Sequence, residues 1–498
     1  MRLTRAAARA LIEQRHKIVD NLPGDVLLEI FDSYRSIIKH LFEKNHRRVW
    51  NSRHGWFKLA HVCRNWRLVV LASSSRLHLR LFFTVHRSPR AVMLTRLPPL
   101  PITVDYPSGA NNHLEQNRLV NALRSPNRVH EIAFQETVDF RDKFLKVTNH
   151  PFPKLRRLVL HHELSLSSFP TKLFSGATPC LQHLWVTGAS LSSLSSLLLS
   201  ASSLVDLTLD QTLAHPSSAS SLCAYLQCMP YLRYLKLQMR EHSKVDVVPL
   251  IEAKDPIPLL RLTCFHFVGS RQYLEALLSG LTAPFLKDVH ILPKGNADGD
   301  SLLDPIPNLS RFICDIDKPF SAVRISFSEY AEDLFRNIIL TDLCSTNESP
   351  FKIYVPGKMV SMAHICGELS VKLAEVEDLF LSSTSHMSNR GSRRYGILWS
   401  GLFGQFHNVK KLWVQCGLKL EIAYFLGEDD GKLAMGLLPE LKEIYLLCDD
   451  HFLPSTCCDA PTMVRNALEP FCTARDRADL PVDLIWRKHS ECPFNYNN

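Results

Sequence analysis

Cysteine is sparse in this sequence, and its spacing is not that of a disulfide scaffold. Fourteen cysteines are spread over 498 residues, and no two of them form a C-x-x-C pair. Small secreted proteins that depend on disulfides carry a much denser cysteine framework. We therefore expect reduced, mostly buried thiols and a cytoplasmic or nuclear localisation.

A long, uninterrupted apolar run is also absent. The longest candidate, residues 191–209, contains seven serines and an aspartate, whereas a membrane-spanning helix needs about 20 predominantly apolar residues. We expect no signal peptide and no membrane partner. Residues 1–9 contain three arginines, which leaves a mitochondrial presequence as an alternative to a solvated basic helix. The acidic residues Glu13 and Asp20 favour the solvated helix.

Motifs of the common catalytic and cofactor sites are missing as well. The sequence has no G-x-S-x-G elbow, P-loop, H-E-x-x-H pair or dinucleotide fingerprint. Residues 296–300 begin like a calcium loop but lack its distant carboxylate. Residues 448–458 hold Cys, Asp and His without a second ligand pair at zinc spacing. We predict that the protein is not an enzyme and has no cofactor or metal.

Positive charge is concentrated at the N-terminus. Residues 1–90 hold 18 Lys and Arg against 6 Asp and Glu, a net charge of +12, whereas the remainder holds 40 against 43, a net charge of −3. A basic surface favours an acidic partner. Nucleic acid is the rival partner, but no motif with base-contacting residues accompanies these charges. We therefore do not expect nucleic acid as a partner.

The basic region contains two apolar stripes at helical spacing. The first follows Leu22-Pro23, and proline suits a first helical turn. The stripes consist of Val26, Leu27, Ile30 and Phe31, and of Trp56, Leu59, Val62, Cys63 and Trp66. Two short helices cannot bury this many large side chains against each other. The remainder must face the rest of the chain, as a helical cap would, or a partner.

Residues 21–31 (NLPGDVLLEIF) and 59–67 (LAHVCRNWR) resemble the two ends of an F-box, the helical module that docks a protein onto the Skp-family adaptor of a cullin–RING ubiquitin ligase. The wide spacing, with residues 39–53 between the two ends, and residues 69–81 that follow resemble fungal F-box proteins. There a short helix leads into the first strand of a repeat domain. The resemblance implies that the adaptor-binding residues are Leu22, Pro23, Val26, Leu27, Ile30, Phe31, Leu59, Val62, Cys63 and Trp66.

From about residue 100 onward the sequence repeats the pattern apolar-x-x-apolar-x-apolar. Copies occupy residues 129–134, 155–160, 181–186, 204–209, 232–237, 262–267, 286–291, 309–314, 376–381, 409–414 and 441–446. Up to residue 309 they begin 23 to 30 residues apart, close to the leucine-rich-repeat period of roughly 20–29 residues. Apolar residues two apart share one face of a strand, and residues 190–201 and 217–229 have helical periodicity.

The predicted fold class is α/β, with a small N-terminal helical module followed by an irregular leucine-rich-repeat solenoid of parallel inner strands and outer helices. We place a basic extension at 1–18, the F-box-like module at 19–75, the solenoid at 76–490 and a tail at 491–498. Residues 315–375 fit the repeat poorly, with candidate strands at 323–327 and 351–355.

In each strand, the side chain between the two paired apolar residues and the side chain just before that pair point to the opposite, concave face. Aromatic and cationic residues are frequent there, and such residues anchor many interfaces. The predicted target-binding residues are Arg157, Trp185, Tyr234, Lys236, His266, Lys411, Trp413 and Tyr445. The alternative is that a C-terminal segment or inward curvature covers these aromatics.

The resemblance to an F-box, followed by a repeat array, implies the substrate-recognition subunit of an SCF-type ubiquitin ligase, which would bind an unknown protein substrate and reach cullin through the adaptor. A second hypothesis is a non-catalytic scaffold that acts outside any ligase. A third is a role unrelated to ubiquitin, in which the basic N-terminus contacts nucleic acid or mitochondria.

Overall fold

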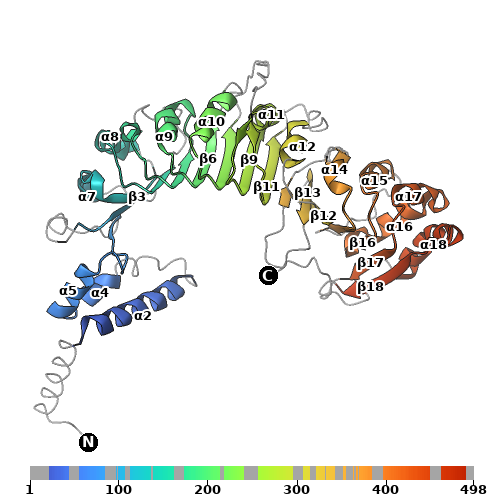
Figure 1. Cartoon of the computed structure of the whole chain (residues 1–498), viewed down its shortest axis with the longest axis horizontal. Coiled ribbons are helices and arrows are strands. Elements are labelled where there is room, and N and C mark those ends of the chain that lie inside the picture. The colour runs from blue at the N-terminus through green and yellow to red at the C-terminus, as the bar shows by residue number, and fades with distance from the viewer. Residues whose placement is uncertain are drawn as a thin grey trace, which may run out of the picture. The chain divides into compact units, whose positions relative to one another are not determined.

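The computed structural model describes most of the chain (Figure 1). The chain forms two compact units. Unit 1 comprises Met1–Gly188 and Ser192–Ser202, and unit 2 comprises Ala189–Leu191 and Ser203–Asn498. The described residues are 22–43, 55–84, 97, 99–106, 113–135, 138–161, 173–213, 218–240, 256–294, 307–314, 321–330, 333–341, 352–354, 363, 366–367, 369–383, 396–448 and 461–488. The predicted extension (1–18), the tail (491–498), the calcium-loop-like residues (296–300) and most of the cysteine-containing segment (449–458) lie outside them.

Unit 1 begins with a helical module of α2 (Gly24–Glu43), α4 (Gly55–Ala60) and α5 (Arg64–Ala72). Cys63 caps α5 by accepting a hydrogen bond from the backbone of Trp66. The side chains of Leu27 and Phe31 are buried, and the Phe31 ring packs edge-on against Trp66 at 5.0 Å. The helices predicted from the two apolar stripes are therefore confirmed. Among the described residues, no helix is both long and apolar enough to cross a membrane.

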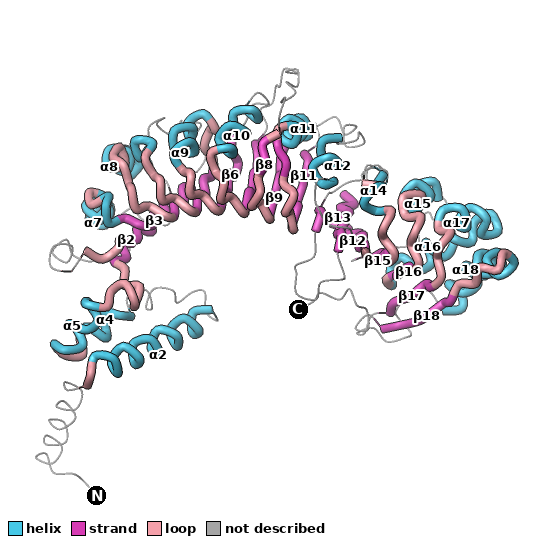
Figure 2. The backbone as a smooth tube through the Cα atoms, viewed as in Figure 1, coloured by secondary structure: helices cyan, strands magenta, loops and turns pink. Residues whose placement is uncertain are grey.

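The rest of unit 1 is a parallel sheet in chain order, with its helices on one side of the strands (Figure 2). Its strands are β1 (Leu81–Thr84), β2 (Ile102–Tyr106), β3 (Val129–Gln135), β4 (Arg157–His161) and β5 (His183–Thr187). The helices between and after them include α7 (His113–Leu123), α8 (Val138–Val147) and α9 (Ser195–Ser200). Strand β1 lies where the resemblance places the first strand of the repeat domain, whereas β2 was not predicted.

The first part of unit 2 has the same kind of arrangement, with parallel strands and intervening helices. Parallel strands β6 (Asp206–Leu213), β7 (Tyr234–Arg240), β9 (Cys264–Ser270) and β11 (Asp288–Lys294) alternate with α10 (Ser218–Gln227) and α11 (Arg271–Ser279). The short strands β8 (Ile257–Pro258) and β10 (Leu281–Thr282) pair separately. In most repeats the first apolar residue of the pattern precedes the strand and is buried, as at Leu232 and Leu262. The predicted solenoid of strands and outer helices is confirmed.

Residues 309–314 are helical, and the prediction of a strand there is wrong. They belong to α12 (Pro307–Cys314), in which Leu309 and Phe312 are buried three residues apart. The repeated pattern contains this spacing, so it fits a helix as well as a strand. Hydrogen bonds to α11 favour the helix. Asn308 donates to the Glu275 carboxylate of α11 at 2.8 Å, and Arg311 donates to the Leu278 carbonyl of α11 at 3.0 Å.

An antiparallel hairpin interrupts the parallel order where the repeat was hardest to recognise. Strands β12 (Ala322–Tyr330) and β13 (Asp333–Thr341) pair antiparallel. The next strand, β14 (Lys352–Tyr354), pairs with both β13 and β11. The candidate strands at 323–327 and 351–355 are confirmed as β12 and β14, whereas β13 was not predicted. Because β13 is antiparallel to β12, the prediction of parallel strands only is wrong in this region.

The final part of unit 2 returns to parallel strands with helices on one side. The strands are β15 (Asp378–Ser383), β16 (Lys411–Val414), β17 (Glu443–Cys448) and the unpredicted β18 (Asp483–Lys488). The helices are α14 (Ser370–Leu373), α15 (Gly396–Phe403), α16 (Lys419–Gly427), α17 (Lys432–Leu437) and α18 (Pro461–Arg477).

We expect Gly431→Ala to lower the free energy of unfolding by about 2–3 kcal/mol. Gly431 has φ +77°, and a Cβ atom there would lie 2.6 Å from the Cα of Phe471 in α18. Gly436, inside α17, provides the matched control, because a Cβ atom added there would meet no neighbouring group within 4 Å. Denaturant unfolding should show Gly436→Ala to be neutral or slightly stabilising. Equal effects of the two substitutions would contradict the prediction.

Candidate functional site

The helical module has an exposed apolar stripe on α2. Pro23, Val26 and Ile30 recur at helical spacing, and Val26 and Ile30 are 40% and 38% exposed. Val62 and Leu68 add exposed apolar side chains at the α4–α5 turn and on α5. We call Pro23, Val26, Ile30, Val62 and Leu68 the apolar surface of the module. Exposed apolar side chains that recur along one side of a helix, as Pro23, Val26 and Ile30 do, are typical of protein-contact sites.

The other residues that the resemblance assigns to adaptor binding are less accessible. Leu27 and Phe31 are buried, with exposures of 0% and 1%, and they hold α2 against α5. Leu22, Leu59, Cys63 and Trp66 are partly buried. The structure thus divides the predicted set into residues that build the module and residues that a partner can reach. Leu68 was not predicted, although it is 60% exposed on α5.

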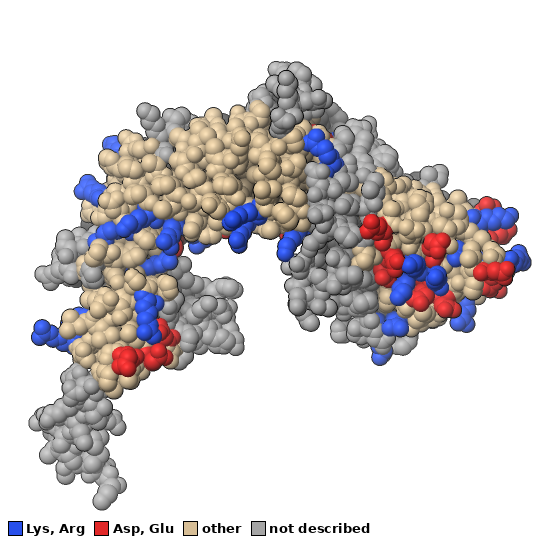
Figure 3. Space-filling model, in the orientation of Figure 1, with Lys and Arg blue, Asp and Glu red and all other residues tan. Residues whose placement is uncertain are grey.

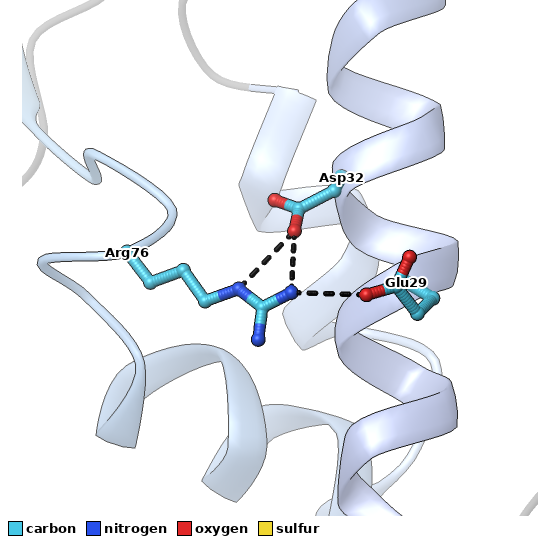
Figure 4. Close-up of polar contacts among 3 residues, drawn as sticks. All are labelled: Glu29, Asp32 and Arg76. Carbon is cyan, nitrogen blue, oxygen red and sulfur yellow. Dashed lines mark hydrogen bonds and ion pairs between the residues drawn. The ribbon is translucent and has the colours of Figure 1, made fainter.

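Arg76 contacts two acidic side chains of α2, Glu29 and Asp32 (Figure 4). Its Nη2 atom lies 2.7 Å from Asp32 Oδ2 and 3.2 Å from Glu29 Oε1. The hydrogen bond to Asp32 is the main reason that the pKa of Arg76 is raised. These groups are solvated, so their contribution to stability is small. Arg76 instead fixes the position of two acidic side chains of α2 beside a cation. Figure 3 shows Lys and Arg beside Asp and Glu on this module.

Trp185 is the exposed aromatic on the strands of unit 1, on the face away from the helices, which we call the open strand face. It is 41% exposed on β5, and its ring meets that of His161 on β4 at 4.9 Å. Arg157, also exposed, lies in register with His183 on this face. The structure therefore brings the predicted residues Arg157 and Trp185 together on an accessible surface.

The open strand face of unit 2 carries a half-buried polar cluster on β7, β9 and β11. Two rows cross the strands in register, namely Tyr234, Cys264 and Asp288, and Lys236, His266 and His290. The His266 ring lies 5.4 Å from that of Tyr234 and 5.3 Å from that of His290. Three of the predicted target-binding residues, Tyr234, Lys236 and His266, are thus neighbours.

Burial and mutual proximity shift several pKa values in this cluster. Burial, with a further contribution from Asp288, raises the pKa of Cys264 to about 12. Burial also raises the pKa of Tyr234 and, together with His266, lowers the pKa of His290. The Cys264 thiol is therefore protonated at neutral pH and donates to Asp288 Oδ2 at 3.6 Å.

Trp413 and Tyr445 lie in a buried cluster. They are 5% and 7% exposed, and their rings stack at 3.7 Å with an interplanar angle of 7°. The cluster also contains Ala322, Phe380 and Leu447, with Ile485 of β18 packed against it. Trp413 donates to Asp378 at 3.1 Å, and Tyr445 donates to Glu443 at 2.6 Å. The alternative that the aromatics are covered therefore holds for these two residues and not for Trp185.

Cys264 and Asp288 are the residues of the cluster that the sequence interpretation missed. Each is the first residue of its strand, in the repeat position that also provides Arg157, Tyr234 and Lys411. Aligning the repeats by this position would have shown that cysteine and aspartate are adjacent. Their separation of 24 residues along the chain conceals the pairing.

No protein-family model matches the chain, and no curated protein matches it. Among solved structures, the leucine-rich repeat-containing protein LegL7 from Legionella pneumophila is similar at 13% sequence identity. The similarity covers 70% of this chain and 87% of that protein, with a TM-score of 0.25. A TM-score this low supports no inference about function.

Proposed function

We propose that the chain is a non-catalytic receptor that binds a Skp-family adaptor through the apolar surface of its helical module and a protein target through its open strand face. It would thereby serve as the substrate-recognition subunit of an SCF-type ubiquitin ligase. The exposed stripe of Val26 and Ile30 carries the proposal, because it lies in the segment that resembles the start of an F-box and remains uncovered in the folded module. Cullin would be reached only through the adaptor.

The open strand face of each unit supports the target-binding half of the proposal. Trp185 is accessible on that of unit 1, and Tyr234 and Lys236 are partly accessible on that of unit 2. Tryptophan, tyrosine and arginine are common anchors of protein interfaces. We retain Arg157, Trp185, Tyr234, Lys236, His266 and Lys411 as target-binding candidates. Lys411 is partly exposed, and its Nζ atom lies 3.8 Å from Glu443 Oε2. Trp413 and Tyr445 contribute through packing.

A scaffold that acts outside a ligase is the second candidate function. The accessible aromatic and cationic side chains on the strands favour protein binding whether or not ubiquitin is transferred. The two functions differ in the partners that reach the helical module. Only the ligase subunit requires cullin.

Affinity purification of the full chain from cells distinguishes these functions. Recovery of both a Skp-family adaptor and a cullin is the result expected for a ligase subunit. Recovery of adaptor without cullin would favour the scaffold. Absence of both, with a folded chain, would reject adaptor docking and favour a role unrelated to ubiquitin.

We expect Trp185→Ala to reduce target capture about tenfold or more, because removing a central aromatic anchor typically costs at least about 2 kcal/mol. Tyr424→Ala is the matched control, since Tyr424 is a 50% exposed aromatic on α16. Quantitative proximity labelling with each full-length variant measures the effect. If wild type and Trp185→Ala label the same proteins equally, Trp185 does not anchor the target, and the prediction is wrong.

A further inference from the structure

The polar cluster on β9 and β11 contains three potential metal ligands from three different residue types. Cys264 Sγ, one ring nitrogen of His266 and one carboxylate oxygen of Asp288 all lie within 4.8 Å of one another. Each residue is partly buried. No other group of three or more such ligands occurs among the residues that the structure describes.

The backbone explains why these side chains converge. Cys264 and His266 are two residues apart on β9 and therefore point to the same face. Asp288 is the direct neighbour of Cys264 on the parallel strand β11. Two strands held in register thus fix the three Cα positions independently of any loop. Sites on regular elements hold ligands more precisely than sites on loops.

Two of the three ligand distances already match zinc coordination. With Zn–S of about 2.3 Å and Zn–N and Zn–O of about 2.0–2.2 Å, a tetrahedral ion separates sulfur from oxygen by roughly 3.6 Å and nitrogen from oxygen by roughly 3.4 Å. The observed distances are 3.6 Å from Cys264 Sγ to Asp288 Oδ2 and 3.5 Å from His266 Nε2 to Asp288 Oδ2. The third distance, between Cys264 Sγ and a ring nitrogen of His266, is no more than 4.8 Å, and zinc binding would have to draw these two atoms closer together.

We propose that this cluster binds Zn²⁺ through Cys264 Sγ, His266 Nε2 and Asp288 Oδ2, with water as the fourth ligand on the open strand face. The combination of sulfur, imidazole and carboxylate selects zinc over magnesium or calcium, which prefer oxygen ligands alone. His266 Nε2 is buried and makes no hydrogen bond within the described part of the chain, so ligation would satisfy it. Zinc binding displaces the thiol proton of Cys264.

Zinc titration of the full-length, chelator-treated protein tests the site. We expect one zinc ion to bind per chain, measured by elemental analysis and by competition with a chromogenic chelator. Cys264→Ser, His266→Gln and Asp288→Asn should each weaken binding by about 100-fold or more. Cys180→Ser and His183→Gln alter an exposed cysteine and an exposed histidine elsewhere and should leave affinity unchanged.

Alkylation of the unmutated chain gives a second readout that does not depend on variant folding. Zinc should slow the alkylation of Cys264, mapped by peptide mass spectrometry, and chelation should restore it, whereas Cys180 should react equally in both states. The proposal is overturned if the wild type takes up no zinc. Stoichiometric binding that the three substitutions do not weaken, or that leaves Cys264 alkylation unchanged, would also overturn it.

Discussion

Ile30→Asp is expected to weaken binding of the chain to a Skp-family adaptor by about 100-fold or more. Ile30 and Val26 lie one turn apart on the exposed stripe of α2. A carboxylate at the centre of an apolar contact loses its hydration without gaining a partner, and the loss of an interface anchor alone costs at least about 2 kcal/mol. The module itself should remain folded, because Ile30 is 38% exposed and surface substitutions usually change stability by less than about 0.5 kcal/mol.

Binding of purified adaptor to the full chain, measured by calorimetry, provides the test. Leu199→Asp is the control, since Leu199 is a 53% exposed leucine on α9, outside the module. It should bind adaptor like the wild type. Leu27→Ala offers a contrast, because truncating a fully buried leucine should lose both stability and binding. Undiminished adaptor binding by Ile30→Asp would exclude the stripe as the docking surface.

Arg475→Met is expected to lower the stability of unit 2 by about 3–5 kcal/mol. Arg475 is a 2% exposed residue of α18. Its guanidinium donates to the carbonyls of Leu438, Pro439 and Leu441 before β17 and to that of Leu480 after α18. Methionine fills a similar volume but leaves these buried carbonyls without their donor. Hydrogen bonds from a charged group contribute about 1.5–3 kcal/mol each.

Denaturant unfolding of the full chain checks this expectation. Arg477→Met is the matched control, because Arg477 lies in the same helical turn and is exposed. It should shift the unfolding free energy by less than about 0.5 kcal/mol. If both substitutions had the same small effect, the Arg475 hydrogen bonds would not stabilise the junction between α18 and β17.

Much of the fold could be predicted because the repeated pattern reflects a packing requirement. Each copy needs one buried residue before the strand and two within it, as Leu232, Leu235 and Leu237 show. The pattern misleads where its three-residue spacing also suits a helix, as in α12. Strand β18 does not carry the pattern, so only its pairing with β17 reveals it.

Exposure at the binding candidates could not be predicted, because it depends on the neighbouring strands. Trp185 and Trp413 occupy the same repeat position. Trp185 lies beside the small side chain of Val159, whereas Trp413 lies between Phe380 and Tyr445, which cover it. The metal-ligand cluster could not be predicted for the same reason, because only the register of β9 and β11 brings Cys264 beside Asp288.

The hairpin of β12 and β13 has a consequence for synthesis of the chain. A parallel solenoid can grow strand by strand as it leaves the ribosome, but the neighbour of β11 is β14, the last of the next three strands to be made. The open edge of β11 therefore stays without a partner until Tyr354 has emerged, 60 residues after Lys294. At about 5–20 residues per second this delay is roughly 3–12 s. During that interval the unpaired edge is a site for chaperone binding or misassembly.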